Sequence, residues 1–180
     1  SSNLLLGNLP PGLTRIQNYS VFGGQRIPLD PFKAKHLPSD DFLTTVDDMT
    51  LLLKTFTSGD MDKTVYDALF TRQIANNALI SGRSFGFSVV KYGDYEAYIH
   101  DGGIPGSNTR LLVIPEIKLG LFLTYNSNNL KARESLTNAV LSDLIDDFES
   151  IDGHVPYAID DLSKFNGVFS PVNVSKETLE

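Results

Sequence analysis

The chain has 180 residues, of which 41% are hydrophobic and 21% are charged, and this is the composition of a globular domain with its own core. The formal net charge of −7 excludes a protein that follows nucleic-acid phosphates with clustered Lys and Arg. Because the chain contains no cysteine, disulfides, thiolate nucleophiles and thiolate zinc sites are excluded as well. The 3 histidines lie far apart, and no apolar run approaches the ~20 residues of a membrane span. The sequence therefore predicts no metal, no cofactor and no transmembrane segment.

The first part of the chain divides into a segment without clear periodicity and two helices. Residues 1–38, the N-terminal segment, are rich in Gly, Pro and Asn and are expected to be irregular. Thr45 can cap the first helix, and Asp48 lies where a capping box places an acid. A second helix is predicted over residues 62–74. The residues at helical spacing, which are expected to point inward, are Val46, Met49, Leu53 and Phe56 in the first helix and Val65, Leu69 and Ile74 in the second.

The pattern then changes to the alternation of β-strands. Four strands joined by short loops are predicted, and such loops imply an antiparallel sheet. The predicted fold class is therefore α+β, with helices packed on an antiparallel sheet in an α/β/α-type sandwich. The predicted ranges are 85–90, 95–100, 110–114 and 119–125 for the strands and 130–148 for a long helix. The face of this helix expected to cover the sheet carries Leu136, Val140, Leu144 and Phe148, with Leu141 and Ile145 beside them.

The composition changes again where the main domain, residues 39–149, is expected to end. Residues 150–161 are polar and contain Gly153 and Pro156, which is typical of a linker. Residues 162–180 begin a new apolar pattern, which stops without a partner.

Two short motifs match sequences of serine nucleophile chemistry, but their positions favour structural roles. Ser88 and Lys91 match S-x-x-K, in which a lysine activates a serine at the start of a helix. Here the pair lies on a predicted strand, where residues three apart point to opposite faces. Residues 127–129, Ser-Asn-Asn, lie between a strand and a helix and are typical of a turn with an N-cap. Neither motif is predicted to be catalytic.

A histidine followed by an acid and two glycines stands at the end of a predicted strand, as His100, Asp101, Gly102 and Gly103. Glycines at such positions let another backbone or a ligand approach the strand closely. If the strand lies at the edge of the sheet, the N–H of Gly103 could hold a developing oxyanion, and His100 could handle a proton beside it. The simpler interpretation is a Gly-Gly turn after an exposed histidine, and the four residues alone favour it.

The order of these segments resembles the serine β-lactamase and DD-peptidase-like family, in the branch of the class C β-lactamases and their esterase and peptidase relatives. Residues 43–49 (LTTVDDM) resemble its l-s-T-a-x-D-m segment, and residues 85–87 (FGF) resemble its y-G-x-G strand. Residues 100–106 (HDGGIPG) resemble H-x-G-G-x-P-G, this branch's version of the third active-site motif. Residues 111–126 resemble the two strands that follow, so the resemblance covers about residues 40–148.

The resemblance implies acyl transfer through a serine ester, on a small-molecule or peptide substrate with an acyl group. His100 matches the position that orients the substrate or assists proton transfer, and Gly103 matches the position of one oxyanion-hole N–H. Asp101 and Gly102 complete the motif as substrate-binding positions, although an acid at Asp101 would repel an anionic substrate. The chain lacks an S-x-x-K that opens a helix and a Y-x-N, so the chain alone is expected to be inactive.

The resemblance therefore predicts an internal fragment of a longer, exported (periplasmic or extracellular) serine hydrolase, with residues 162–180 as the truncated start of a β-rich C-terminal domain. A sheet without the strands from the rest of such a domain would expose an edge, so association into a homo-oligomer is expected. The alternative is a non-catalytic binding or interaction module that keeps the fold, and the acid at Asp101 favours it.

Overall fold

The structure is a computed structural model, and it describes residues 3–4, 12, 14–32, 42–74, 82–146 and 148. Its centre is an antiparallel sheet of 5 strands, which follow one another in chain order. This confirms the predicted α+β class, and the strand that the prediction missed is the two-residue β5, which is too short to leave a periodic signal. The strands are β5 (Gly82–Arg83), β6 (Ser88–Tyr92), β7 (Tyr95–Ile104), β8 (Ser107–Ile114) and β9 (Leu119–Tyr125).

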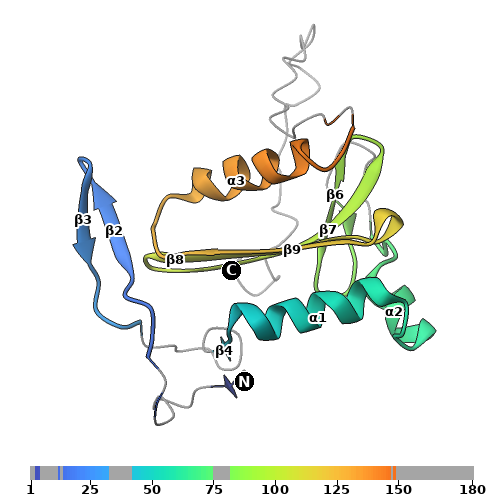
Figure 1. Cartoon of the computed structure of the whole chain (residues 1–180), viewed down its shortest axis with the longest axis horizontal. Helices are drawn as coiled ribbons and strands as arrows, with labels where there is room; N and C mark the ends of the chain where they lie inside the picture. Colours follow the sequence, from blue (N-terminus) through green and yellow to red (C-terminus); the bar gives the residue numbers. More distant parts are fainter. Residues whose placement is uncertain are drawn as a thin grey trace, which may run out of the picture.

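Helices cover both faces of this sheet (Figure 1). On one face lie α1 (Val46–Ser58) and α2 (Lys63–Leu69), and on the other lies α3 (Leu130–Ser142). Each helix begins after a residue whose side chain accepts hydrogen bonds from backbone N–H groups of the first turn. These caps are Thr45, Asp62 and Asn129, and the first of them confirms the predicted start of α1.

The helix α2 is shorter than predicted, and part of the predicted inner faces is exposed. The predicted range of 62–74 is cut short because Ile74 forms a β-bridge with Arg83 instead of continuing the helix. Val46 lies at the first position of α1 and is 57% exposed. The predicted inward residues that are exposed are Val46, Val65 and Ile74.

The core between the sheet and α1 is built from aromatic rings. Phe70 lies between Phe56 of α1 and Tyr98 of β7, with ring centroids 5.4 Å from each. These edge-to-face contacts are the arrangement that aromatic pairs prefer. The helix can approach β9 closely because a Cβ on Gly120 would lie 2.9 Å from Leu53 Cδ2. The predicted inward positions of Leu53 and Phe56 are confirmed, since both are buried.

The core on the other side of the sheet corrects the predicted inner face of the last helix. Leu141 is fully buried and Ile145 is nearly so, and α3 ends at Ser142, earlier than predicted. The helix is turned because the buried Arg110 of β8 takes a polar partner from it, with Arg110 Nη1 3.3 Å from the hydroxyl of Thr137. The predicted inward residues that are exposed instead are Leu136 (44%), Val140 (38%) and Leu144 (58%).

The N-terminal segment, which was predicted to be irregular, contains a β-hairpin. β2 (Tyr19–Phe22) and β3 (Gln25–Pro28) pair around Gly23 and Gly24, which both have the positive φ that such a two-residue turn requires. The sequence did not reveal the hairpin because its strands have little buried surface and no alternating apolar pattern. A second small sheet pairs β1 (Asn3–Leu4) with β4 (Phe42–Leu43).

The rest of the predicted domain division falls outside the described residues. This applies to the linker, residues 150–161, and to the segment 162–180, so both remain predictions. Within the described ranges, none of the helices has the length and apolar character needed to cross a membrane.

Candidate functional site

The strand β7 has two halves with different neighbours. Residues 95–99 pair with β6 on one side, and the ladder between β7 and β8 on the other side begins at Tyr98. Residues 100–104 pair with β8, and no strand among the described residues covers their other side. The five residues 100–104 are therefore a free edge, called the β7 edge below. The predicted strand end at His100 is wrong, because β7 continues through both glycines to Ile104.

The β7 edge is free because the chain turns away just before β6. Gly86 has φ 81, a value that favours glycine, and the Ser84 N–H donates to Phe87 O across the turn at 3.0 Å. Pairing therefore starts only at Ser88, opposite Ile99. A side chain at position 86 would be strained in this conformation, so one glycine in the neighbouring segment decides where the edge begins.

Two hairpins determine which backbone groups point toward the β7 edge. The loop Pro105–Gly106 is closed by the pair Ile104 and Ser107, and the loop at 93–94 by Tyr92 and Tyr95. Pairs that close two-residue loops are hydrogen-bonded, and hydrogen-bonded pairs alternate along an antiparallel ladder. Both hairpins give the same result, in which the N–H and C=O groups of Asp101 and Gly103 point away from β8.

Packing within the sheet accounts for the absence of a side chain at Gly102 better than at Gly103. A Cβ on Gly102 would overlap Thr109 Oγ1 on the neighbouring strand, so the glycine makes room for the threonine side chain. At Gly103 a Cβ would lie 3.2 Å from Asn108 Oδ1, which is tight but adjustable. Gly103 is also exposed, so its missing side chain leaves the β7 edge open to a ligand backbone.

His100 is held in one orientation and one tautomer. Its Nδ1 lies 2.6 Å from Gly86 O, and because a carbonyl oxygen only accepts, Nδ1 must carry the proton. Nε2 is then the acceptor when the ring is neutral. The ring stands edge-to-face on Phe87 at 6.3 Å, and the residue is exposed. His100 thus fastens the turn that frees the β7 edge and presents an acceptor beside it.

Asp101 lies on the opposite face of the sheet, under α3, where two arginines neutralise it. Arg110 Nε and Nη2 each lie 2.8 Å from its carboxylate, and Arg133 Nε lies 3.4 Å away. Burial lowers the pKa of Arg110, but its hydrogen bonds to Asp101 and Glu134 together raise the pKa by more than burial lowers it. The pKa is therefore above its ordinary value, and the group stays charged. The expected repulsion of an anionic substrate by Asp101 is therefore offset by the guanidinium groups.

The structure places the predicted site residues at three different locations. His100 and Gly102 lie on the face toward α1, whereas the side chain of Asp101 lies on the face toward α3, and Gly103 contributes backbone to the β7 edge. Arg110 was missed, although an arginine inside the apolar strand sequence, in register with Asp101, is a signal for a buried ion pair. The described residues contain no group of three or more His, Asp or Glu that could hold a metal ion.

The two serine motifs have structural roles. Ser88 lies on β6 and its hydroxyl accepts a hydrogen bond from Arg83, while Lys91 is exposed on the same strand. In the second motif Asn129 caps α3, as predicted, and Asn128 Oδ1 accepts from the Val21 N–H at 2.9 Å.

Comparison with known proteins places the fold without giving a family. No family model matches the chain, and no curated protein matches it. A crystal structure of SurE matches with a TM-score of 0.55 and 22% sequence identity, over 74% of this chain and 34% of that chain. A likeness at this identity shows a shared fold alone. The chain spans about a third of the length of SurE.

These comparisons contradict the resemblance to the serine β-lactamase and DD-peptidase-like family. No family model supports it, and the matching solved structure is SurE rather than a β-lactamase or a penicillin-binding protein. The assignment as a fragment of a serine hydrolase or esterase is corrected with it. Local packing accounts for the residues that suggested it, since Gly102 makes room for Thr109 and Asp101 binds Arg110. Gly106 makes room for the N-terminal segment, because a Cβ there would lie 2.9 Å from Tyr19 N.

Proposed function

We propose that this chain is a binding module that takes up an extended polypeptide segment as an additional strand on the β7 edge. The observation that carries the proposal is the pairing pattern, in which β7 continues five residues beyond the strand that covers it. A free strand edge presents unpaired N–H and C=O groups at the spacing of a partner strand. Gly103 supports this use, because it is exposed and its N–H and C=O groups point away from β8.

His100 and the charges near the β7 edge fit such a ligand. The Nε2 acceptor of His100 would receive an N–H or O–H of the ligand, since Nδ1 is already committed to Gly86 O. Asp101 and Glu134 are balanced by Arg110 and Arg133, so the edge carries no strong charge of either sign. The backbone would therefore provide most of the affinity, and the ligand side chains would provide specificity.

Replacement of Gly103 by proline tests the proposal. Peptides are first selected from a library of random linear sequences on the wild-type chain, and their binding is then measured by fluorescence anisotropy. Gly103→Pro removes the N–H that points to the β7 edge and leaves the ladder with β8 intact, a place where strands tolerate proline. We expect at least ~10-fold weaker binding. The matched control is Gly103→Ala, which adds the same Cβ, keeps the N–H and should lose less than half of that effect.

Two substitutions of His100 separate its two nitrogens. His100→Asn keeps a donor near the place of Nδ1 and loses the acceptor at Nε2, whereas His100→Gln places an amide near Nε2. We expect His100→Gln to bind the selected peptides more tightly than His100→Asn. Equal binding by wild type, Gly103→Pro and both His100 variants would show that the peptides bind elsewhere, and the proposal would be wrong.

A further inference from the structure

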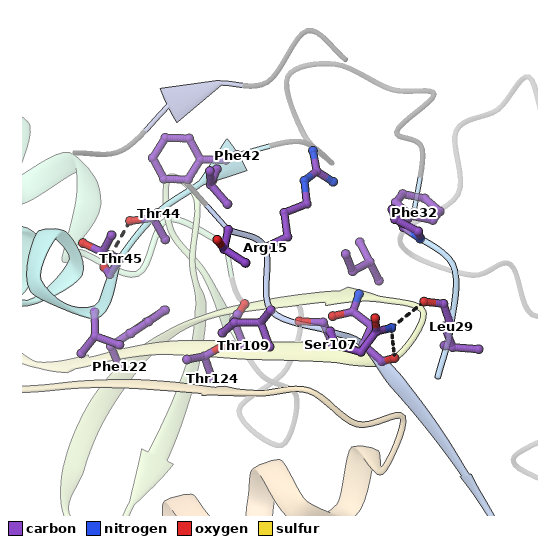
Figure 2. A pocket seen from close by; sticks show the side chains of 18 residues that line it. Arg15, Leu29, Phe32, Phe42, Thr44, Thr45, Ser107, Thr109, Phe122 and Thr124 are labelled. Atoms are coloured by element: carbon purple, nitrogen blue, oxygen red, sulfur yellow. Dashed lines mark hydrogen bonds between the residues drawn. The ribbon is translucent and has the colours of Figure 1, made fainter. Parts of the chain in front are cut away.

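A cavity of about 540 Å³ lies on the α1 side of the sheet, near the β7–β8 turn. Its size is within the range of roughly 300–1,000 Å³ that is typical of small-molecule sites. The floor is formed by strands β8 and β9, and the walls come from residues 14–18, from parts of 29–32 and from residues 42–46. Figure 2 shows Thr109, Phe122 and Thr124 on the sheet, with Phe42 across the cavity from them.

The wall from the N-terminal segment is fastened to the sheet by specific contacts. Asn126 Nδ2, directly after β9, donates to Gln17 O at 2.9 Å, and within the segment Gln17 Nε2 donates to Leu29 O at 2.8 Å. Gly106, with φ 72, allows this approach, because a Cβ there would lie 2.8 Å from Leu29 Cδ1 and 2.9 Å from the backbone of Tyr19. One wall of the cavity therefore packs directly against the sheet.

The floor offers two threonine hydroxyl groups that have no partner among the described residues, with apolar side chains beside them. Thr109 and Thr124 face each other across β8 and β9, and neither hydroxyl makes a hydrogen bond within the described residues. Thr109 is partly buried, so its hydroxyl is available to a ligand inside the cavity. Phe122, Phe42 and Ile104 supply apolar surface beside them.

The charges select among ligands that have an apolar body and a polar head. Among the described residues that line the cavity there is no Asp or Glu, and Arg15 is the one charged side chain of this set, which disfavours a cationic head. The net charge of −7 disfavours an anionic head at long range. We propose that the cavity binds a neutral amphiphile, whose medium-length hydrocarbon body lies between Phe42 and Phe122 and whose carbonyl oxygen accepts from the hydroxyls of Thr109 and Thr124. This proposal does not rest on the polypeptide site proposed for the β7 edge, although Ile104 borders both sites.

The test uses the neutral fluorophore N-phenyl-1-naphthylamine and three competitors that each have a ten-carbon chain. These are monodecanoin, which is neutral, decanoate, which is anionic, and decyltrimethylammonium, which is cationic. We expect the fluorophore to bind the wild-type chain and monodecanoin to displace it at lower concentration than either ion. Absence of fluorophore binding, or displacement by either ion at least as readily as by monodecanoin, would overturn the proposal.

Two variants locate the binding in the cavity and on its hydroxyls. Thr109→Val keeps the shape of the side chain and should lower the affinity for monodecanoin at least ~10-fold. The affinity for the fluorophore should change less than twofold. Thr124→Trp fills the cavity from an exposed position and should abolish binding of both compounds. Thr55→Val on α1, outside the cavity, is the matched control and should change neither affinity. Circular dichroism checks that each variant is folded, and unchanged monodecanoin affinity in folded Thr109→Val would also overturn the proposal.

Discussion

The two halves of β7 continue one another in the backbone but differ in their surroundings. In the half formed by residues 95–99, Ala97, Tyr98 and Ile99 are buried, and β6 covers one side of the strand. In the half formed by residues 100–104, only the β8 side is paired within the described chain, and every residue is exposed or half-buried. The difference does not originate in β7. It follows from the turn at Gly86, which precedes β6, so that pairing with β7 starts only at Ser88 and leaves the β7 edge accessible.

Amide hydrogen exchange should show the largest difference between the two halves. The N–H of Ala97 points toward β6 and that of Gly103 points in the same direction, where the β7 edge is open. We expect Ala97 to exchange at least ~10³-fold more slowly than Gly103, after correction for intrinsic rates, because only Ala97 is bonded. The measurement is exchange followed by NMR, with Gly102, which bonds β8, as a protected control. Equal protection of Ala97 and Gly103 would mean that another segment covers the edge.

Removal of Arg110 should give the next largest effect, since it ties the open half of β7 to α3. Arg110→Met leaves the carboxylates of Asp101 and Glu134 without their shared partner, and the free energy of unfolding should fall by about 3 kcal/mol. The measurement is urea unfolding. Arg133→Met is the matched control, because this arginine lies 3.4 Å from Asp101 and should cost less than about 1 kcal/mol. A larger loss for Arg133→Met would contradict the central role of Arg110.

Beside the covered half of β7, the free energy of unfolding should depend on pH through Tyr92 of β6. This residue pairs with Tyr95 and is fully buried. Burial raises the pKa of Tyr92 to about 12, because the ionised phenol would lose its hydration. The neutral form is therefore stabilised in the folded state, and this stability is complete below pH ~10 and lost as the pH rises through about 12. We expect wild type to lose about 2 kcal/mol more than Tyr92→Phe between these pH values.

Unfolding in urea at several pH values checks the result for Tyr92. At neutral pH, Tyr92→Phe should be as stable as wild type or more stable, because the buried hydroxyl has no hydrogen-bond partner among the described residues. Parallel pH profiles for the two proteins would show that Tyr92 is not the group responsible.

The smallest effect is expected where β7 and β8 meet in the open half. Gly102→Ala places a methyl group against Thr109 Oγ1 and should cost about 1–2 kcal/mol of unfolding free energy. The same substitution in a Thr109→Ala background should cost less than about 0.5 kcal/mol, because the overlapping atom has been removed. The double-mutant cycle is measured by thermal unfolding. An equal cost in both backgrounds would mean that the glycine is required for the backbone and not for the threonine.

The elements of the fold were predictable where local signals are strong. Thr45 and Asn129 cap helices as predicted, and the alternating strands imply the antiparallel sheet. The inner face of α3 was predicted incorrectly, because Leu136, Val140 and Leu144 form a good apolar stripe in isolation. The partner that turned the helix is Arg110, a residue on another element, and helical periodicity carries no information about it.

The candidate site was predictable only in its composition. His100 and Gly103 were identified from residue type, but the strand was expected to stop at His100, and the family resemblance drawn from the surrounding motifs was wrong. Glycine and histidine are also used for packing and for fastening turns, as Gly102 makes room for Thr109 and His100 bonds the turn at Gly86. Their local order therefore does not specify chemistry.

The sequence by itself determined the α+β class and the helix caps, because both depend on residues close together in the chain. Only the tertiary structure decided that the β7 edge is free, that Asp101 is neutralised, and that Thr109 and Thr124 share a cavity with the N-terminal segment. Each of these depends on contacts between residues far apart in the sequence. Such contacts follow from register and packing, which no local pattern encodes.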